Sequence, residues 1–210
     1  MKTILFQGDS ITDWYRDRDR DDILGANYAL MAAGELGCKE PNKYNFVNRG
    51  IGGDRTVDIL ARVHKEMLQI KPDYVSILVG INDVWHGFDL QNGITDKNFE
   101  LYYNLIIEEI RDVVPSAEIM MLEPFILDAS VTKGRWEEFS AEVFKKAEIV
   151  RKAAKDNNTL FVPLQETFNR AAELAPAEFW TIDGVHPTAA GHCLIKNEWI
   201  KAFEQLQCPK

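Results

Sequence analysis

Cysteine is scarce in this chain, whose 210 residues include only Cys38, Cys193 and Cys208. Three scattered thiols cannot build a disulfide framework, and no cluster of histidines and cysteines accompanies them to bind zinc. Their odd number leaves at least one free thiol, and we expect all three to be reduced. We also expect that the protein needs no metal and no other cofactor.

Basic residues are too few to balance the acidic ones: 24 Lys and Arg stand against 33 Asp and Glu, a formal net charge of -9. A chain of this charge repels polyanions, so nucleic acids and anionic membranes are poor partners. No apolar run approaches the roughly 20 residues of a membrane span. The apolar run at 4–6 is also too short for a signal peptide, and we therefore expect a cytoplasmic protein.

Internal repeats, low-complexity tracts and linkers rich in Pro, Gly or Ser are absent as well. Nothing in the composition divides the chain into separate parts. With 46% apolar residues the chain can bury a substantial core. We expect one domain that spans residues 1–210.

Apolar runs of strand length alternate with segments that have helical periodicity. The runs cover residues 3–6, 44–48, 74–79, 118–122 and 160–162, and the helical patterns cover 27–36, 56–69, 98–113, 137–156 and 188–206. This alternation is typical of βαβ units. It predicts an α/β protein with a flavodoxin-like three-layer α/β/α fold and a five-stranded parallel sheet.

Three polar or flexible positions follow the first three of these strands, namely Ser10, Gly53 and Asn82. Ligands of doubly wound sheets bind at the carboxyl ends of the strands, so we expect these positions to converge at one edge. The segments 86–95 and 124–135 look irregular, and we expect them to form the walls of the same cleft.

Ser10 follows Gly8 and Asp9 at the end of the first strand, where a tight turn can expose its hydroxyl group. A serine hydroxyl attacks a carbonyl group only when a base lies beside it. Taken alone, the Gly-Asp-Ser sequence is equally compatible with a helix N-cap or a phosphate-binding turn.

A base that works near neutral pH must be a histidine, and the chain has four of them. His64 and His192 lie in helical patterns and are interpreted as surface and structural residues, while His86 suits a substrate contact better than a base. His186 has an aspartate, Asp183, three residues before it, close enough for one turn to bring the carboxylate to the ring, where it could fix the tautomer and stabilise the imidazolium. Alone, Asp-x-x-His would also fit a loop turn or half of a metal site.

An acyl-transfer site also needs hydrogen-bond donors for its oxyanion, each of which contributes roughly 3 kcal/mol to the transition state. The candidates are the backbone N–H groups of Ser10 and Gly53 and the side-chain amide of Asn82. Glycine lets the backbone approach a substrate closely, and asparagine is a neutral donor. Considered separately, Gly53 would fit an ordinary βα turn and Asn82 a helix cap.

Together, four segments resemble the sequence blocks of the SGNH hydrolases, also called the GDSL esterase family, over essentially the whole chain. The segments are Gly8-Asp9-Ser10, Asn48-Arg49-Gly50-Ile51-Gly52-Gly53-Asp54, Gly80-Ile81-Asn82-Asp83 and Asp183-Gly184-Val185-His186-Pro187. The resemblance implies that Ser10 is the nucleophile, with His186 as its base and Asp183 behind it. It also implies an oxyanion hole made by Ser10, Gly53 and Asn82.

The segments 8–13, 80–85 and 185–187 look like those of bacterial intracellular acetylxylan esterases within this family, which remove acetyl groups from xylose oligomers. The resemblance implies a serine esterase for short acyl, mainly acetyl, esters of carbohydrates. A lysophospholipase or thioesterase of the same family is the alternative. A glycan-binding module fits an intact triad poorly, and a phosphoesterase lacks a metal cluster in the sequence. Related esterases often assemble, so we expect a homo-oligomer.

Substrate contacts are expected from residues next to the four segments. An exposed indole offers a flat apolar face that suits a pyranose ring, although burial beneath the site is an equal alternative for each tryptophan. Arg55 could bond to sugar hydroxyl groups or pair with an acidic neighbour. The expected contacts are Asp9, Arg55, Trp85 and Trp180, and Trp14 also lies beside a segment.

The charges alternate in sign between positions 16 and 22, directly after the proposed nucleophile. This pattern is typical of a solvated loop. We expect the loop to cover the cleft from above. Because it has no contiguous apolar surface, it does not suit a lid that meets a lipid interface.

Overall fold

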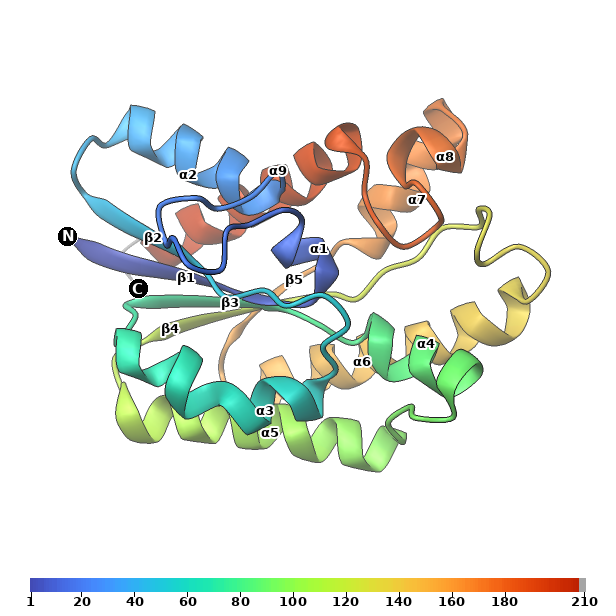
Figure 1. Ribbon diagram of the computed structural model, residues 1–210, viewed down its shortest axis with the longest axis horizontal. Coiled ribbons are helices and arrows are strands. Elements are labelled where there is room, and N and C mark those ends of the chain that lie inside the picture. The colour runs from blue at the N-terminus through green and yellow to red at the C-terminus, as the bar shows by residue number, and fades with distance from the viewer. Residues whose placement is uncertain (208–210) are drawn as a thin grey trace.

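The computed structural model describes residues 1–207. At its centre lies a sheet of five parallel strands in the order β2-β1-β3-β4-β5 (Figure 1). This is the flavodoxin-like order, so the predicted fold class is confirmed. The strands are β1 (Lys2–Gly8), β2 (Tyr44–Asn48), β3 (Tyr74–Leu78), β4 (Glu118–Leu122) and β5 (Leu160–Val162).

Helices cover both faces of the sheet (Figure 1). One face packs against α2 (Tyr28–Lys39), α7 (Gln165–Leu174) and α9 (Ala189–Gln207). The other packs against α3 (Thr56–Glu66), α5 (Asp96–Val113) and α6 (Trp136–Asp156). The shorter elements are α1 (Ser10–Asp13), the 3-10 turn η1 (Leu68–Ile70), α4 (Ile81–Leu90) and α8 (Ala177–Trp180).

The central strands are largely apolar because their side chains alternate between the two helical layers. In β1, Phe6 belongs to the apolar cluster on the α2 and α9 side, whereas Leu5 belongs to the cluster on the α3 and α5 side. In β3, Leu78 and Ile77 divide in the same way. Both faces of the sheet are therefore buried, and only its edges are left for a ligand.

The structure corrects several predicted segments. The segment 86–95 is irregular only from residue 91, because His86–Leu90 completes α4. The helical spacing of Ile81, Val84 and Phe88 is present in the sequence, but the run is short and contains Gly87, a poor helix former. Of the predicted helix 56–69, α3 covers the part up to Glu66, and the 3-10 turn η1 follows from Leu68.

Besides α4, three helices of the described chain have no counterpart in the sequence prediction, namely α1, α7 and α8. Two of them have only four residues, too few to show a period. The third, α7, is mostly polar and buries little more than Phe168 and Ala171, so its apolar stripe is narrow. The segment 124–135 contains no helix or strand, as predicted.

Cys38 and Cys193 are free, exposed thiols, and Cys208, also predicted to be reduced, lies outside the described residues. No helix within residues 1–207 is long and apolar enough to cross a lipid bilayer. In the same part of the chain, no three His, Cys, Asp or Glu side chains are grouped so that they could hold a metal ion.

Candidate active site

The loops that follow the first three strands meet at the carboxyl edge of the sheet. The N–H of Ile51, after β2, donates to the carbonyl of Gly8 at the end of β1 over 3.0 Å. The N–H of Asp9 donates to the carbonyl of Leu78 at the end of β3 over 3.4 Å. The convergence expected from the sequence is thus made by backbone hydrogen bonds.

Ser10 is the first residue of α1 and lies directly beyond β1. Asp9 turns the chain from strand to helix, because its Oδ1 accepts the N–H of Ile11 over 3.0 Å and so caps α1. Gly8 is required before it, since a Cβ there would lie 2.4 Å from the carbonyl oxygen of Leu78. The half-buried Ser10 side chain places Oγ 2.9 Å from Nε2 of His186.

Asp183 is hydrogen-bonded to both the ring and the backbone of His186. Its Oδ2 lies 2.7 Å from Nδ1 of the ring, and its Oδ1 accepts the backbone N–H groups of His186 over 2.8 Å and of Val185 over 2.9 Å. The same carboxylate therefore fixes the turn and the ring. With Nδ1 donating to the carboxylate, Nε2 faces Ser10 without a proton, as a base requires.

The segment 124–135 holds this turn from outside. The N–H of Leu127 donates to the carbonyl of Gly184 over 2.8 Å, and the N–H of Val131 donates to that of Asp183 over 3.1 Å. Val185 is fully buried in an apolar cluster that includes Phe139 of α6. The turn is anchored on both sides, so the imidazole ring has a fixed support.

Replacement of Gly184 by alanine should lower the free energy of unfolding by about 1–3 kcal/mol more than replacement of Gly134. Both glycines have positive φ, 102° and 91°, so both variants carry the strain of a left-handed alanine. Only at position 184 would the new Cβ clash, 2.5 Å from the carbonyl oxygen of Leu127, whereas position 134 has open space. Urea unfolding of the two variants measures the difference, and equal losses would contradict it.

Burial and hydrogen bonding act on the pKa values of this pair in opposite directions. Burial disfavours the charged ring of His186, but the hydrogen bond and charge of Asp183 outweigh it and hold the histidine pKa above its ordinary value. Burial favours the neutral carboxyl of Asp183, but the hydrogen bonds from His186 and Val185 hold its pKa below the ordinary value. The arrangement favours a carboxylate beside an imidazolium, which is the state reached once the ring has taken a proton.

At the carboxyl edge of the sheet, the backbone N–H groups of Ser10 and Gly53 differ from those of their neighbours in donating no hydrogen bond within the described residues. Along residues 49–56, each N–H other than that of Gly53 donates a hydrogen bond to another part of the described chain. Along residues 8–14, the same holds for each N–H other than that of Ser10. Gly53 has a φ of 87° and open space where a Cβ would stand, so a ligand can approach its backbone. Both groups are free to bind an oxyanion.

Asn82 is the second residue of α4, directly beyond β3, and is 7% exposed. Its Nδ2 donates to the backbone carbonyl of Asp54 over 3.1 Å. An amide nitrogen has two hydrogens, so this bond fixes the side chain and leaves one hydrogen to donate. Asp54 is itself held by Arg62, whose Nε donates to Oδ2 over 2.7 Å. The structure thus brings Asn82 beside the residue that follows Gly53.

Two indole rings flank the imidazole of His186. The ring of Trp14 stacks on it at a centroid distance of 5.5 Å, and that of Trp85 lies 5.9 Å away, tilted by 49°. Both tryptophans are half-buried. Trp85 is fixed by a hydrogen bond from Nε1 to Asp89, which itself pairs with Arg135. A hollow of about 330 Å³ beside Ser10 is lined by Ser10, Asp13, Trp14, Tyr15, Arg16 and Arg18.

Asp9, expected to contact substrate, is 1% exposed, and its carboxylate caps α1. A substrate contact of Asp9 stays a prediction. Burial raises the pKa of Asp9 to about 7. The solvated loop expected at 16–22 needs correction at its start: Arg16 is buried, and its Nε donates to the carbonyl of Gly50 over 2.6 Å.

Arg55 and Trp180, also expected to contact substrate, are engaged in structural bonds. Arg55 pairs with Asp58 through Nε over 2.8 Å and donates from Nη1 to the carbonyl of Asn92, also over 2.8 Å. Trp180 is half-buried against the core cluster on the α9 side, and its Nε1 donates to the carbonyl of Ala175 over 3.2 Å. The structure does not bring Trp180 onto the imidazole as it brings Trp85, and substrate contacts of Trp180 and Arg55 stay a prediction.

The other three histidines occupy different surroundings. His64 is exposed and pairs with Glu109. His86 is half-buried in α4, and burial lowers its pKa. His192 is 1% exposed, stacks on Tyr28, and has a pKa lowered by burial to about 4. Within residues 1–207, His186 is the histidine whose ring reaches a serine hydroxyl.

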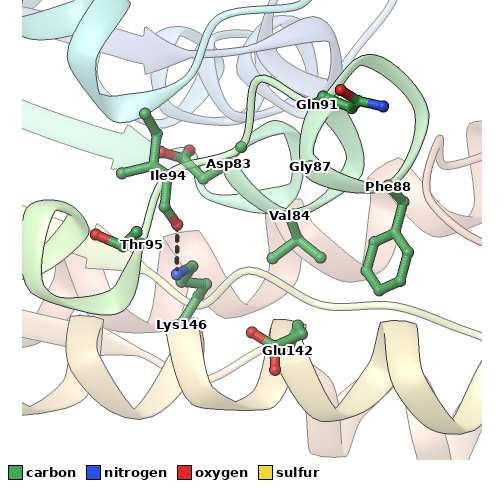
Figure 2. Close-up of a pocket in the computed structure, with 10 residues that line it drawn as sticks. Asp83, Val84, Gly87, Phe88, Gln91, Ile94, Thr95, Glu142 and Lys146 are labelled. Atoms are coloured by element: carbon green, nitrogen blue, oxygen red, sulfur yellow. Dashed lines mark hydrogen bonds between the residues drawn. The ribbon is translucent and has the colours of Figure 1, made fainter.

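A second cavity, of about 450 Å³, lies between α4, the segment 91–95 and α6 (Figure 2). Lys146 of α6 donates into it, to the carbonyl of Ile94 over 2.8 Å. Asp83 lines it with a buried carboxylate that accepts the hydroxyl of Thr56 over 2.6 Å, and burial raises its pKa to about 7. Neither Ser10 nor His186 lines this cavity, and it contains no nucleophile beside a base, so we place the active site at the smaller hollow.

Comparisons with known proteins agree with this geometry. Residues 6–194 match the model of the GDSL-like lipase/acylhydrolase family. The chain is 31% identical to an acetylxylan esterase of Geobacillus stearothermophilus, over 94% of this chain and 92% of that protein. It is 28% identical to thioesterase 1/protease 1/lysophospholipase L1 of Escherichia coli, over 97% of this chain and 84% of that one.

Among solved structures, a Parabacteroides merdae protein that carries the name GDSL-like lipase superposes with a TM-score of 0.92 at 33% identity. The match covers 97% of this chain and 95% of that one. A family model and a relative above 30% identity thus both extend over nearly all of the sequence. The chain belongs to the GDSL-like lipase/acylhydrolase family, the SGNH hydrolases, and is a carboxylic ester hydrolase that acts on small ester substrates.

Proposed function

We propose that the protein is a serine esterase that removes short acyl groups, chiefly acetyl, from the hydroxyl groups of carbohydrates such as xylo-oligosaccharides. One observation carries the proposal: Oγ of Ser10 lies 2.9 Å from Nε2 of His186, whose Nδ1 lies 2.7 Å from Asp183. These contacts are within hydrogen-bonding distance, so a proton can pass from the serine to the ring while the carboxylate stabilises the resulting charge.

In the first half of the reaction, Oγ of Ser10 attacks the ester carbonyl carbon, and its proton moves to Nε2 of His186. The new C–O bond leaves a negative charge on the former carbonyl oxygen. The N–H groups of Ser10 and Gly53 and the amide of Asn82 bind this oxyanion. The bond to the sugar oxygen then breaks, and the sugar leaves with the proton from His186, so that an acyl group stays on Ser10.

In the second half, a water molecule gives a proton to Nε2 of His186 and attacks the acyl carbon. A second oxyanion forms in the same place and is bound by the same donors. The bond to Oγ of Ser10 breaks, and Ser10 takes the proton back from His186. The acid leaves and the enzyme returns to its starting state, with one ester and one water consumed and one acid and one alcohol formed.

Two observations support acetylated sugar as the substrate. The relative from Geobacillus stearothermophilus is named an acetylxylan esterase. In this chain, Trp14 and Trp85 flank the ring of His186, where their indole faces can pack against the pyranose that carries the ester.

A panel of substrates tests the proposal. Acetylated xylo-oligosaccharides, a lysophospholipid and an acyl thioester are incubated separately with the enzyme, and the released acid is titrated. The acetylated sugar should give the highest kcat/KM. Against p-nitrophenyl esters, kcat/KM should fall steeply beyond about four acyl carbons, because each extra methylene has to fit a pocket shaped for acetyl.

The alternative is a lysophospholipase or thioesterase with the same triad. It is favoured by the Escherichia coli relative, whose name carries both activities. In the panel, this alternative predicts faster turnover of the lipid or the thioester and a rate that rises with acyl length. Either result would replace the carbohydrate assignment without affecting the roles of Ser10 and His186.

A further inference from the structure

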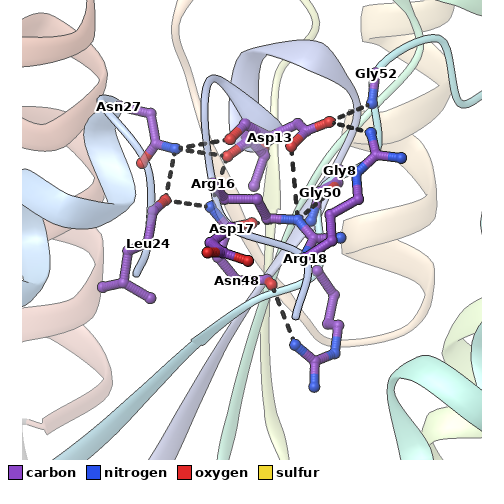
Figure 3. A network of polar contacts seen from close by, with 12 residues as sticks. Gly8, Asp13, Arg16, Asp17, Arg18, Leu24, Asn27, Asn48, Gly50 and Gly52 are labelled. Atoms are coloured by element: carbon purple, nitrogen blue, oxygen red, sulfur yellow. Dashed lines mark hydrogen bonds and ion pairs between the residues drawn. The ribbon is translucent and has the colours of Figure 1, made fainter. Parts of the chain in front are cut away.

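We infer that Asp13 is a positioning residue for the oxyanion hole, because it fixes the glycine loop that carries the Gly53 donor to the helical turn that carries Ser10. The inference rests on the proposed function, since it concerns the same oxyanion. Asp13 lines the hollow beside Ser10, and the inference gives its carboxylate a role in the geometry of the oxyanion hole. Figure 3 shows the polar network that surrounds it.

Asp13 holds the loop through its side chain. Its Oδ2 accepts the backbone N–H of Gly52 over 2.9 Å and is also bonded by Nη2 of Arg18 over 2.6 Å (Figure 3). The Nε of Arg16 lies 3.6 Å from Oδ1 of the same carboxylate while it donates to the carbonyl of Gly50 over 2.6 Å. Two peptide groups of the loop are thus held, one by an acceptor and one by a donor.

The loop needs such support because it contains a Gly-Gly pair within one turn. The N–H of Asp54 donates to the carbonyl of Ile51 over 3.1 Å, which closes a four-residue turn with Gly52 and Gly53 at its centre. Gly53 has a φ of 87° and Gly52 does not have a positive φ, which is the pattern of a type II turn. A flip of the central peptide would convert it to type I and point the Gly53 N–H the other way.

Asp13 limits this flip by fixing the peptide group before it. Glycine gives the central peptide little steric resistance of its own, so the orientation of the Gly53 N–H depends on what holds its neighbours. The hydrogen bond from the N–H of Asp54 to the carbonyl of Ile51 closes the turn, and Asp13 adds a second bond to the peptide group of Ile51 and Gly52 through the Gly52 N–H. Without Asp13, this N–H would have only water to bond.

Asp13 also sets the distance between the two backbone donors. It is the last residue of α1, whose first residue is Ser10, and residues three apart lie on one face of a helical turn. A Cβ added to Gly52 would lie 3.6 Å from Oδ2 of Asp13 and 3.8 Å from Cβ of Ser10, so the glycine lies against both. One short helix therefore carries a nucleophile, one donor and the anchor of the other donor.

The test compares Asp13→Ala and Asp13→Asn with the wild-type enzyme on an acetyl ester. Removal of the carboxylate should lower kcat by about 10- to 30-fold, less than the 100-fold or more that loss of an oxyanion donor costs. KM should change by less than about twofold, because the contact acts in the transition state. The kcat of Asp13→Asn should fall between the values of the wild type and of Asp13→Ala. Its amide oxygen can still accept the N–H of Gly52, but the neutral amide no longer attracts the charge of Arg18.

Asp22→Asn is the matched control. Asp22 lies in the charged segment 16–22, which also supplies Arg18 to Asp13, and forms an equally short ion pair with Arg20, 2.6 Å, but that pair is exposed and does not touch the loop. Its kcat should equal that of the wild type. If Asp22→Asn lowers kcat as much as Asp13→Asn, the effect belongs to the charge of the segment and the inference is overturned.

Two further measurements separate a positioning role from general damage to the fold. A trifluoromethyl ketone, whose adduct with Ser10 carries an oxyanion, should lose affinity in proportion to the loss in kcat. The midpoint of the acid limb of the pH–kcat profile should stay that of the wild type, because Asp13 does not act on His186. A shifted midpoint, an unchanged ketone affinity or an unchanged kcat would each overturn the inference.

Failure of the inference can be told apart from failure of the proposed function. Full activity of Ser10→Ala would remove the serine mechanism, and the role of Asp13 with it. An inactive Ser10→Ala together with a fully active Asp13→Ala would leave the mechanism in place and remove only the role of Asp13. Thermal unfolding of each variant shows whether it is folded, and Asp13→Asn, which keeps the size of the side chain, serves if Asp13→Ala is not.

Discussion

Replacement of Ser10 by alanine should lower kcat for an acetyl ester by at least about 10⁴-fold, because no other group can form the acyl-enzyme. Within residues 1–207 the side chain makes one hydrogen bond, to His186, and its loss leaves the cap of α1 in place, since Asp9 makes that cap. The fold should therefore persist. The measurement is kcat with p-nitrophenyl acetate, combined with thermal unfolding.

Ser116→Ala is the matched control for this variant. Ser116 is exposed and lies between α5 and β4, at the opposite edge of the sheet from the candidate site. It should keep full activity. A fluorophosphonate should form a stable adduct on the wild-type enzyme and on Ser116→Ala but not on Ser10→Ala. Undiminished turnover or labelling of Ser10→Ala would remove Ser10 as the nucleophile.

The parts of the site that could be predicted from sequence are those fixed by short-range geometry. Asp183 lies three residues before His186, so one turn is enough to join them. Ser10, Gly53 and Asn82 each come within five residues of the end of a strand, and a parallel sheet brings such positions to one edge. The order and the register of the strands then place them together without further information.

The contacts that could not be predicted depend on which way a side chain leaves a turn. Asp9 and Ser10 are neighbours, and the sequence does not show that the side chain of Asp9 caps α1 while that of Ser10 faces His186. Arg16 reads as part of a solvated run, yet it is buried because the carbonyl of Gly50 lies within its reach. Asp13 gains its partner only once the glycine loop after β2 is folded beside α1.

Other expectations rest on composition or on family resemblance, and none of the contacts described above tests them. A single domain over residues 1–210, assembly with copies of the same chain and a cytoplasmic location stay predictions. Sedimentation of the purified protein measures whether it assembles with copies of the same chain. The exposed faces of Phe179 and Ile182, close in sequence to Asp183, are the first surface to compare between free and assembled states.

Replacement of Asp183 by asparagine should lower kcat by about 10⁴-fold, as replacement of Ser10 should. It should also change the pH dependence of kcat. The amide nitrogen of asparagine would donate to Nδ1 of His186, so the ring proton would move to Nε2. A ring with its proton on Nε2 cannot accept the proton of Ser10. Asp128→Asn, an exposed change in the neighbouring segment 124–135, is the matched control and should keep full activity.

The pH dependence has a definite sign. In the wild type, the hydrogen bond and charge of Asp183 outweigh burial and raise the pKa of His186, and the base is active only when neutral, so activity falls as pH decreases through this raised pKa. In Asp183→Asn the carboxylate is gone and burial, the largest cause, is opposed only by the charge of Asp9, so the His186 pKa should drop and its titration should move to lower pH. NMR titration of the ring protons follows this pKa even where activity is too low to measure. A His186 pKa that stays the same or rises in Asp183→Asn would mean that the carboxylate is not the group that holds the imidazolium.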